Sequence, residues 1–152
     1  MNQLLYIVLP VIAGASIAAQ SAMSGQLNTF IKNSFFVSFV IYFSSMVVVG
    51  SIIFIQGFEL PSIDLIKSVP RHLWFLGAIL SVFALTLLYW LMPQVGVSRV
   101  MVGVLIGQLF MSLLSSHYGW FGLPIVEINL IKTFGILLII VGVMLINKEY
   151  LW

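Results

Sequence analysis

Long apolar runs dominate the chain, and short polar interruptions separate them. A helix that crosses the hydrocarbon core of a bilayer needs about 20 predominantly apolar residues. Because lipid offers no hydrogen-bonding partner, the backbone groups of such a run must be paired within the segment, which predicts α-helices and excludes a barrel. We therefore predict an all-α integral membrane protein with five transmembrane helices in a single domain over residues 1–152. The predicted helices span Leu4–Leu27, Phe35–Ile55, Leu73–Met92, Val97–Ser115 and Asn129–Ile146.

The composition agrees with a membrane protein. Hydrophobic residues make up 62% of the chain and charged residues 7%, whereas soluble domains carry about 25% charged residues. The chain has no cysteine, so neither a disulfide nor a thiolate metal site is available. Its basic residues are scattered singly, which argues against nucleic acid as a partner. The N-terminal segment lacks the positive region of a signal peptide, so we expect it to be retained as a helix.

Two stripes of small and polar residues run along the first predicted helix. One stripe, which suits close approach by another helix, consists of Gly14, Ala18, Ser21, Ala22 and Gly25. The other, roughly a quarter turn away, consists of Ser16, Gln20, Ser24 and Asn28. Interhelical hydrogen bonds alone would explain Ser16 and Ser24 equally well. An amide has more hydrogen-bonding groups than one helix contact usually satisfies, so we expect Gln20 and Asn28 to border a polar cavity.

The fourth predicted helix carries an uncharged amide, Gln108, at mid-membrane depth. Ser112 lies one helical turn further on and shares its face. Gly103 and Gly107 mark a place where another backbone can come close. An amide in hydrocarbon is costly unless it is hydrogen-bonded. We therefore expect Gln108 and Ser112 to face the polar stripe of the first helix near the midplane.

Two aromatic residues are further candidates for a site. Tyr42 could face a cavity together with Ser38, although ordinary helix packing is the favoured interpretation of both. Trp90 could line a substrate path. Together with Tyr89, however, it is most simply explained as part of an interfacial belt of aromatic residues.

Lysine and arginine are divided equally between the two sides of this five-helix topology. The side of the N-terminus holds Lys67, Arg71 and Lys132, and the opposite side holds Lys32, Arg99 and Lys148. Orientation in the bilayer follows the excess of these residues on the cytoplasmic side, and here the excess is zero. We therefore predict dual topology and an antiparallel dimer of ten helices, whose geometry is that of the inverted repeats in many secondary transporters. The dimer could be a homodimer or a heterodimer with a paralogue.

Five groups of residues occur in an order and spacing that is typical of one family. They are Gly14, Gln20 and Asn28 in the first helix, Pro93-x-x-Gly96 in the expected turn before the fourth helix, Gly107-Gln108 within that helix, the turn His117-x-Gly119-x-x-Gly122, and Gly135 with Gly142 in the fifth helix. Together they resemble the YdcZ-type branch of the drug/metabolite transporter (DMT) superfamily, over essentially the whole chain. The resemblance implies a five-helix protein of the bacterial inner membrane that is half of a ten-helix unit and exports small molecules.

The sequence departs from this family pattern at one position. Similar proteins tend to have an acidic residue just before the histidine of the turn, where this chain has Ser116. The related small multidrug-resistance proteins also rely on a glutamate in their first helix, and this first helix has no carboxylate. Without a buried acid there is no obvious proton carrier and no counter-charge for a cationic drug. We therefore expect a neutral or zwitterionic substrate, recognised by amides, hydroxyls and aromatic rings.

A small-molecule transporter that works by alternating access is the leading hypothesis. Its predicted substrate-binding residues are Gln20, Ser24, Asn28, Gln108, Ser112, Tyr42 and Trp90. The alternative is a non-transporting membrane subunit that assembles or stabilises a larger complex, which the absence of embedded charge fits equally well. An enzyme is disfavoured because acids and histidines lie only near helix ends, with no spacing suited to a metal site. No catalytic residue, metal or cofactor is predicted, and membrane lipids are the only expected partners besides the substrate and the second subunit.

Overall fold

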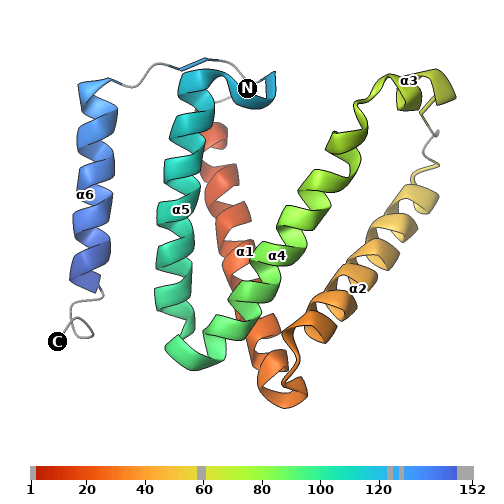
Figure 1. The fold of residues 1–152 in the computed structure, drawn as a ribbon, viewed down its shortest axis with the longest axis horizontal. Coiled ribbons are helices and arrows are strands. Elements are labelled where there is room, and N and C mark those ends of the chain that lie inside the picture. The colour runs from red at the N-terminus through yellow and green to blue at the C-terminus, as the bar shows by residue number, and fades with distance from the viewer. Residues whose placement is uncertain (1–2, 58–60, 123–124, 127–128, 147–152) are drawn as a thin grey trace. The chain divides into compact units, whose positions relative to one another are not determined.

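The computed structural model describes residues 3–57, 61–122, 125–126 and 129–146, and these residues form helices and short connections without a strand. The helices are α1 (Gln3–Ile31), α2 (Ser34–Ile55), α3 (Ile63–Ser68), α4 (Arg71–Val95), α5 (Val97–Tyr118) and α6 (Leu130–Ile146), with a 3-10 turn η1 at Trp120–Gly122 (Figure 1). The all-α prediction is confirmed. Lys148, which entered the predicted charge balance, lies outside the described residues.

Four helices, α1, α2, α4 and α5, are long and apolar enough to cross a bilayer. They correspond to the first four predicted spans. The fifth predicted span is present as α6, a shorter apolar helix of 17 residues. At 1.5 Å per residue α6 is about 26 Å long, which is near the lower limit for a spanning helix. Its crossing of the membrane stays a prediction.

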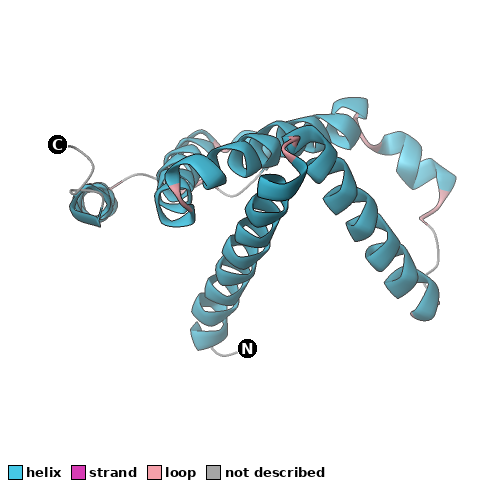
Figure 2. Cartoon of the chain, turned by 90° about the horizontal axis from the view of Figure 1, so that it is seen from below, coloured by secondary structure: helices cyan, strands magenta, loops and turns pink. Residues whose placement is uncertain are grey.

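The chain divides into two compact units, residues 1–97 and 98–152. In the first unit α1, α2 and α4 all contact one another, and the contact of α1 with α4 is the most extensive. Figure 2 shows α1 and α2 diverging from the turn that joins them. In the second unit α5 and α6 lie side by side around a small apolar gap of about 50 Å³ that is lined by residues such as Phe110 and Ile136. The prediction of a single domain stays untested.

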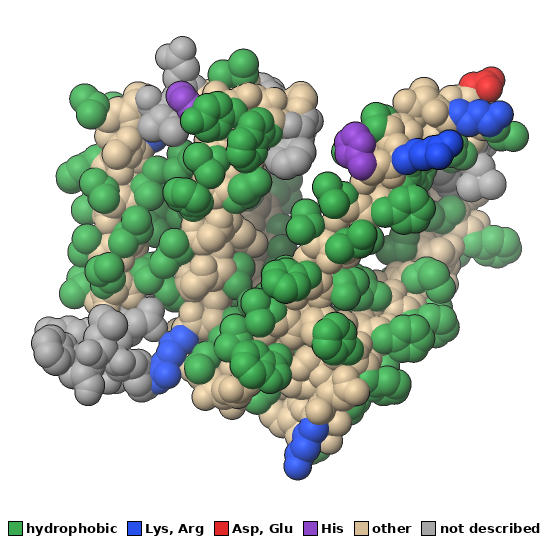
Figure 3. Space-filling model, viewed as in Figure 1, with side chains coloured by type: hydrophobic (Ala, Val, Ile, Leu, Met, Phe, Trp, Pro, Cys, Tyr) green, Lys and Arg blue, Asp and Glu red, His purple; other side chains and the backbone are tan. Residues whose placement is uncertain are grey.

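Apolar side chains cover the lengths of the helices, while the described lysines and arginines lie near helix ends (Figure 3). Leu4, Phe30, Phe54 and Phe75, for example, are all more than two-thirds exposed. Such a surface is unfavourable in water and favourable in lipid. The core that remains in the first unit is therefore narrow and follows the contacts of α4 with its two neighbours.

A two-residue turn joins α1 to α2 and explains why α1 ends at Ile31 rather than at the predicted Leu27. Lys32 adopts a left-handed conformation (φ 56°), and its N–H donates to the carbonyl of Asn28 at 2.9 Å. The side chain of Asn33 then accepts the backbone N–H of Phe36 at 3.1 Å and caps α2. A left-handed residue after a helix and an asparagine cap before the next are the expected chemistry of such a turn.

The connection between α4 and α5 corrects a sequence prediction. Pro93 does not form the turn, because α4 continues through it to Val95. The helix is instead interrupted at Gly96, which has φ 86° and ψ 151° and whose N–H donates to the carbonyl of Met92 at 3.0 Å. Residues with a Cβ rarely adopt this conformation. Helix α4 therefore carries an internal proline four residues after Tyr89.

Candidate functional site

A cluster of uncharged polar side chains lies where α1 contacts α4. The Nε2 group of Gln20 donates to the hydroxyl of Tyr89 at 2.9 Å and to Ser24 Oγ at 3.3 Å. One turn of helix beyond Ser24, Asn28 Nδ2 donates to the backbone carbonyl of Tyr89 at 2.9 Å. Tyr89 is completely buried, and Ser24 and Asn28 are 2% and 8% exposed. The structure thus brings together the three residues of α1 that the sequence singles out.

Close approach of the two backbones at Gly25 makes these hydrogen bonds possible. A Cβ atom at Gly25 would lie 2.8 Å from Met92 Cβ, which is closer than real side chains come. The predicted small-residue stripe is therefore a contact surface at its C-terminal end. At Gly14, nearer the start of α1, a Cβ would meet nothing within 4 Å, so the N-terminal end of the stripe makes no such contact with the described residues.

A second set of polar contacts joins α2 to α4. The hydroxyls of Ser38 and Thr86 are 2.7 Å apart and buried, and the Tyr42 hydroxyl is hydrogen-bonded to Ser81. Each pair consists of hydroxyls in which either oxygen can donate, so no charge is needed to satisfy them. The favoured sequence interpretation of Ser38 and Tyr42 as packing residues agrees with these bonds.

Three open grooves lined by described residues adjoin the polar contacts that α4 makes with α1 and α2. The largest, about 580 Å³ between α1 and α2, is lined by Ser16, Gln20 and Ser24 among apolar residues. A groove of about 450 Å³ between α2 and α4 is lined by Ser38 and Tyr42. The dimensions fit small molecules, since ligand sites commonly measure about 300–1,000 Å³.

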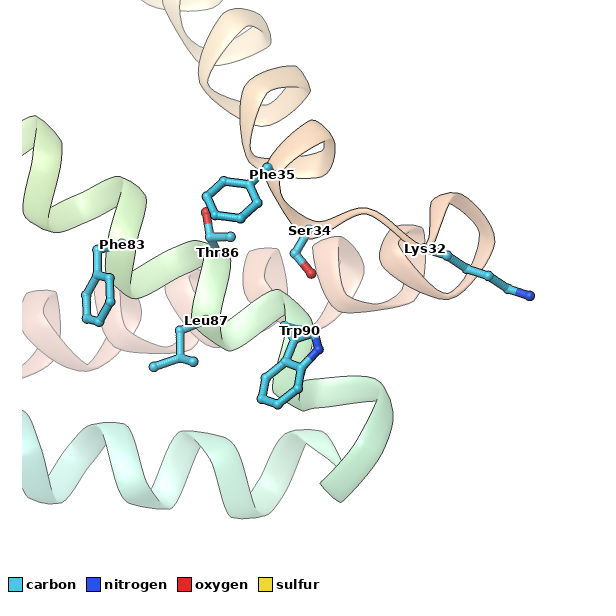
Figure 4. Close-up of a pocket in the computed structure, with 7 residues that line it drawn as sticks. All are labelled: Lys32, Ser34, Phe35, Phe83, Thr86, Leu87 and Trp90. Carbon is cyan, nitrogen blue, oxygen red and sulfur yellow. The ribbon is translucent and has the colours of Figure 1, made fainter.

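The third groove, of about 340 Å³, contains Trp90 (Figure 4). Its walls include the aromatic rings of Phe35 and Phe83 and the hydroxyl-bearing residues Ser34 and Thr86. Trp90 is 53% exposed, unlike the fully buried Tyr89 next to it. Lys32 also borders the groove, but its side chain points away from the other labelled residues (Figure 4).

One buried polar atom in the cluster has no hydrogen-bond partner among the described residues. It is Asn28 Oδ1. The backbone carbonyl of Tyr89 can only accept, so the nitrogen of the Asn28 amide must face it and the oxygen must point elsewhere. Buried polar groups are normally satisfied, which makes this oxygen the one unmet acceptor that a water molecule or a donor group could fill.

The predicted site residues of α5 belong to the second unit. Gln108 and Ser112 are both exposed there. The Ser112 hydroxyl donates to the carbonyl of Leu109 on its own helix at 2.9 Å. Among the described residues, a Cβ at Gly103 or Gly107 would meet nothing within 4 Å. The pairing of this face with the polar stripe of α1 stays a prediction, as does the role of every residue assigned to substrate binding.

The sequence interpretation missed Tyr89. We expected an interfacial aromatic, but the ring is completely buried and the residue receives hydrogen bonds at both its hydroxyl and its carbonyl. A signal was present in the sequence. Thr86, Tyr89 and Met92 follow one another at intervals of three on a single helix face, and Pro93 stands one turn after Tyr89.

Long apolar helices that contact one another through uncharged polar groups define a multi-pass α-helical membrane protein. The chain belongs to the family described as "Putative inner membrane exporter, YdcZ", whose sequence profile matches residues 5–145. The predicted resemblance to the YdcZ-type branch is therefore confirmed, and the protein is a multi-pass protein of the inner membrane. The family description is that of an exporter and not of an enzyme. The searches for similar curated proteins and for similar solved structures gave no match.

Proposed function

We propose that this protein is one half of a small-molecule exporter. In this proposal two oppositely oriented copies, or one copy and a paralogue, alternate the access of a shared site between the two sides of the membrane. Membership of the exporter family supports it. The equal division of lysine and arginine between the two predicted sides supports dual insertion. An antiparallel pair would supply the two halves of an inverted repeat, as in many secondary transporters.

The observation that carries the proposal is the groove beside Gln20. Gln20 and Ser24 line this groove of about 580 Å³. Both are held by hydrogen bonds, since the side-chain amide of Gln20 donates to the Tyr89 hydroxyl and the Ser24 hydroxyl donates to the backbone carbonyl of Gln20 at 2.9 Å. A side chain that is already fixed loses little conformational freedom when it binds a ligand, which favours its use as a recognition group.

The chemistry of the grooves favours a neutral or zwitterionic substrate. Amide, hydroxyl and aromatic groups supply the polarity of their walls, and Lys32, the one charged residue among those that line them, points away (Figure 4). Asp64, the only acidic residue within the described part of the chain, lies in the short helix α3, which is too short to span. A permanent cation would find no counter-charge in such a site.

The remaining predicted residues extend the site. Tyr42 and Trp90 line the two smaller grooves and offer an aromatic surface to the substrate. Gln108 and Ser112 complete the site from α5. Their exposure within the second unit fits this role, because an amide that faces lipid is costly until it acquires a hydrogen-bonding partner.

Inside-out membrane vesicles would test the proposal directly. Vesicles from cells that produce the protein are incubated with a metabolite extract of the same cells, and mass spectrometry identifies the solutes that accumulate. We expect at least one neutral or zwitterionic solute to accumulate with the natural chain, and its accumulation to fall at least tenfold in Gln20→Leu. Gln26→Leu is the matched control, because Gln26 is an exposed amide on the same helix that lines none of these grooves.

Two results would contradict the proposal. One is accumulation that is identical in Gln20→Leu and the natural chain. The other is the isolation of the protein in one fixed orientation, in a stable complex with a different protein and with no solute accumulated, which would support an assembly subunit instead. Reporters active only in the cytoplasm or only in the periplasm, fused to the C-terminus, would establish the orientation.

A further inference from the structure

Helix α4 contains a proline that removes one of the helix's own hydrogen bonds. In an α-helix the carbonyl of residue i accepts the N–H of residue i+4. The residue four positions after Tyr89 is Pro93, which has no N–H. The helix nevertheless continues to Val95. Tyr89 is completely buried, so water cannot supply the missing donor, and an unpaired backbone carbonyl in an apolar environment is costly.

Helix α1 supplies the donor. Asn28 Nδ2 lies 2.9 Å from the Tyr89 carbonyl oxygen, and the bond is buried. We propose that Asn28 is a positioning residue whose side-chain amide replaces the N–H that Pro93 lacks, and that it thereby fixes the direction of the last turn of α4. Asn28 lines none of the three grooves, which separates this role from the substrate contacts of Gln20 and Ser24.

Two neighbouring contacts restrict the same part of α4. Gln20 donates to the hydroxyl of Tyr89, and the backbone at Gly25 lies against Met92, the residue immediately before the proline. Helix α1 therefore holds α4 firmly up to Pro93. Beyond it, the side chains of Gln94 and Val95 are exposed, and the chain reaches Gly96.

The segment from Pro93 to Gly96, which we call the joint, lies at the end of the first compact unit. The first compact unit ends at residue 97 and the second begins at residue 98. Prolines inside helices are sites where the axis bends, because the lost hydrogen bond and the ring relax the helix locally. With Asn28 bound to the Tyr89 carbonyl, the last turn of α4 has one preferred direction, and without that bond it is freer to move. This role does not depend on the proposed transport activity.

A double-mutant cycle tests the inference, because Pro93→Ala returns the missing N–H to the helix. Thermal unfolding of the purified protein in detergent micelles is measured for Asn28→Leu, Pro93→Ala and the double variant. We expect Asn28→Leu to lower the Tm on the order of 5 °C in the natural background. In the Pro93→Ala background the loss should be less than half as large, since the backbone N–H of the introduced alanine then donates to the Tyr89 carbonyl.

Gln20→Leu is the matched control in the same two backgrounds. Gln20 also contacts Tyr89, but through the phenol and not through the carbonyl. Its effect on the Tm should therefore be the same with and without the proline. A rescue that is specific to Asn28 identifies the carbonyl as its partner, whereas a general stabilisation by alanine would reduce both losses.

Spin labels provide a readout that a purely packing role would not change. The chain has no cysteine, so labels can be introduced at Phe30, on α1, and at Val95, within the joint. Pulsed electron paramagnetic resonance should show a broader distance distribution in Asn28→Leu and a narrow one again in the double variant. A second label pair at Phe30 and Ile79, before the proline, should not change.

Equal losses of Tm for Asn28→Leu in the two backgrounds would overturn the inference. So would an unchanged Phe30–Val95 distribution in Asn28→Leu. If Asn28→Leu alone does not fold, the double variant must fold, and failure of both also overturns the inference. If the natural chain accumulates no solute while the double-mutant cycle gives the expected result, the role of Asn28 stands and only the proposed function is contradicted.

Discussion

The α1–α4 contact and the surface of α5 carry the same kinds of residue in different states. In the first, Gly25 lies against Met92 and Gln20 donates to Tyr89. On α5, a Cβ at Gly107 would meet no described residue outside the adjoining turns of its own helix within 4 Å. Gln108 is exposed and has no hydrogen bond to any described residue. Small residues beside an amide form a helix contact in the first case, and on α5 the same combination stays a predicted contact surface. The difference teaches that the surface of α1 is already covered by α4, a helix of its own unit. The surface of α5 is open within residues 98–152.

Alanine in place of the two glycines should give the largest contrast. Gly25→Ala places a Cβ 2.8 Å from Met92 Cβ, and we expect it to lower the free energy of unfolding by about 1–3 kcal/mol, as overpacking does. Gly107→Ala meets open space, so we expect no loss, or a gain of up to about 1 kcal/mol from better helix propensity. Unfolding of each purified variant in mixed micelles measures both values.

A second substitution makes this contrast more specific. Against a Met92→Gly background at least half of the stability lost in Gly25→Ala should be recovered, because that background lacks the Cβ, Cγ and Sδ atoms that the new Cβ would meet. No recovery would mean that Gly25 is needed for its backbone freedom and not for close approach.

The sequence predicted the helices well because membrane helices are long and apolar. Four of the five predicted spans are present at spanning length. Lipid offers the backbone no hydrogen-bonding partner, so a spanning segment must pair its own backbone groups and forms a helix. Their ends were less predictable. The sequence placed the turn at Pro93, but a proline is tolerated inside α4 when a neighbour such as Asn28 supplies the missing donor, and that donor is a tertiary contact.

The candidate site was predictable on α1 and much less so on α4. Spacing along one helix correctly placed Gln20, Ser24 and Asn28 on a common face, because helical geometry is local. Their partner, Tyr89, was assigned to an interfacial belt, since an aromatic near a helix end usually lies there. A tyrosine also suits a buried position when its hydroxyl finds a partner. The sequence does not reveal that Gln20 is this partner.

Leucine in place of the two amides tests whether the surface of α5 needs a partner from elsewhere. Gln20→Leu removes the hydrogen bond to the buried Tyr89 hydroxyl, so we expect the free energy of unfolding to fall by about 1 kcal/mol. Gln108→Leu removes an exposed amide that has no partner among the described residues, so we expect no loss of stability in the monomer. The proposed antiparallel dimer and its transport should instead be weakened severalfold.

Unfolding in micelles and the fraction of cross-linked dimer in the membrane would be measured for both amide variants. A fall in stability for Gln108→Leu equal to that of Gln20→Leu would show that Gln108 already has a partner within one chain. The comparison between the two surfaces would then be wrong at its central residue.

The smallest contrast concerns two serines that are both hydrogen-bonded. Ser38 shares a buried bond with Thr86 on another helix at 2.7 Å, whereas Ser112 donates to the carbonyl of Leu109 on its own helix. We expect Ser38→Ala to lower the free energy of unfolding by about 0.6 kcal/mol, an average value for hydrogen bonds between membrane helices. Ser112→Ala should leave it unchanged, because the Leu109 carbonyl belongs to a helix that is intact without the hydroxyl. A cycle with Thr86→Val isolates the Ser38 bond, and a coupling energy indistinguishable from zero would mean that this hydroxyl pair adds nothing to the contact of α2 with α4.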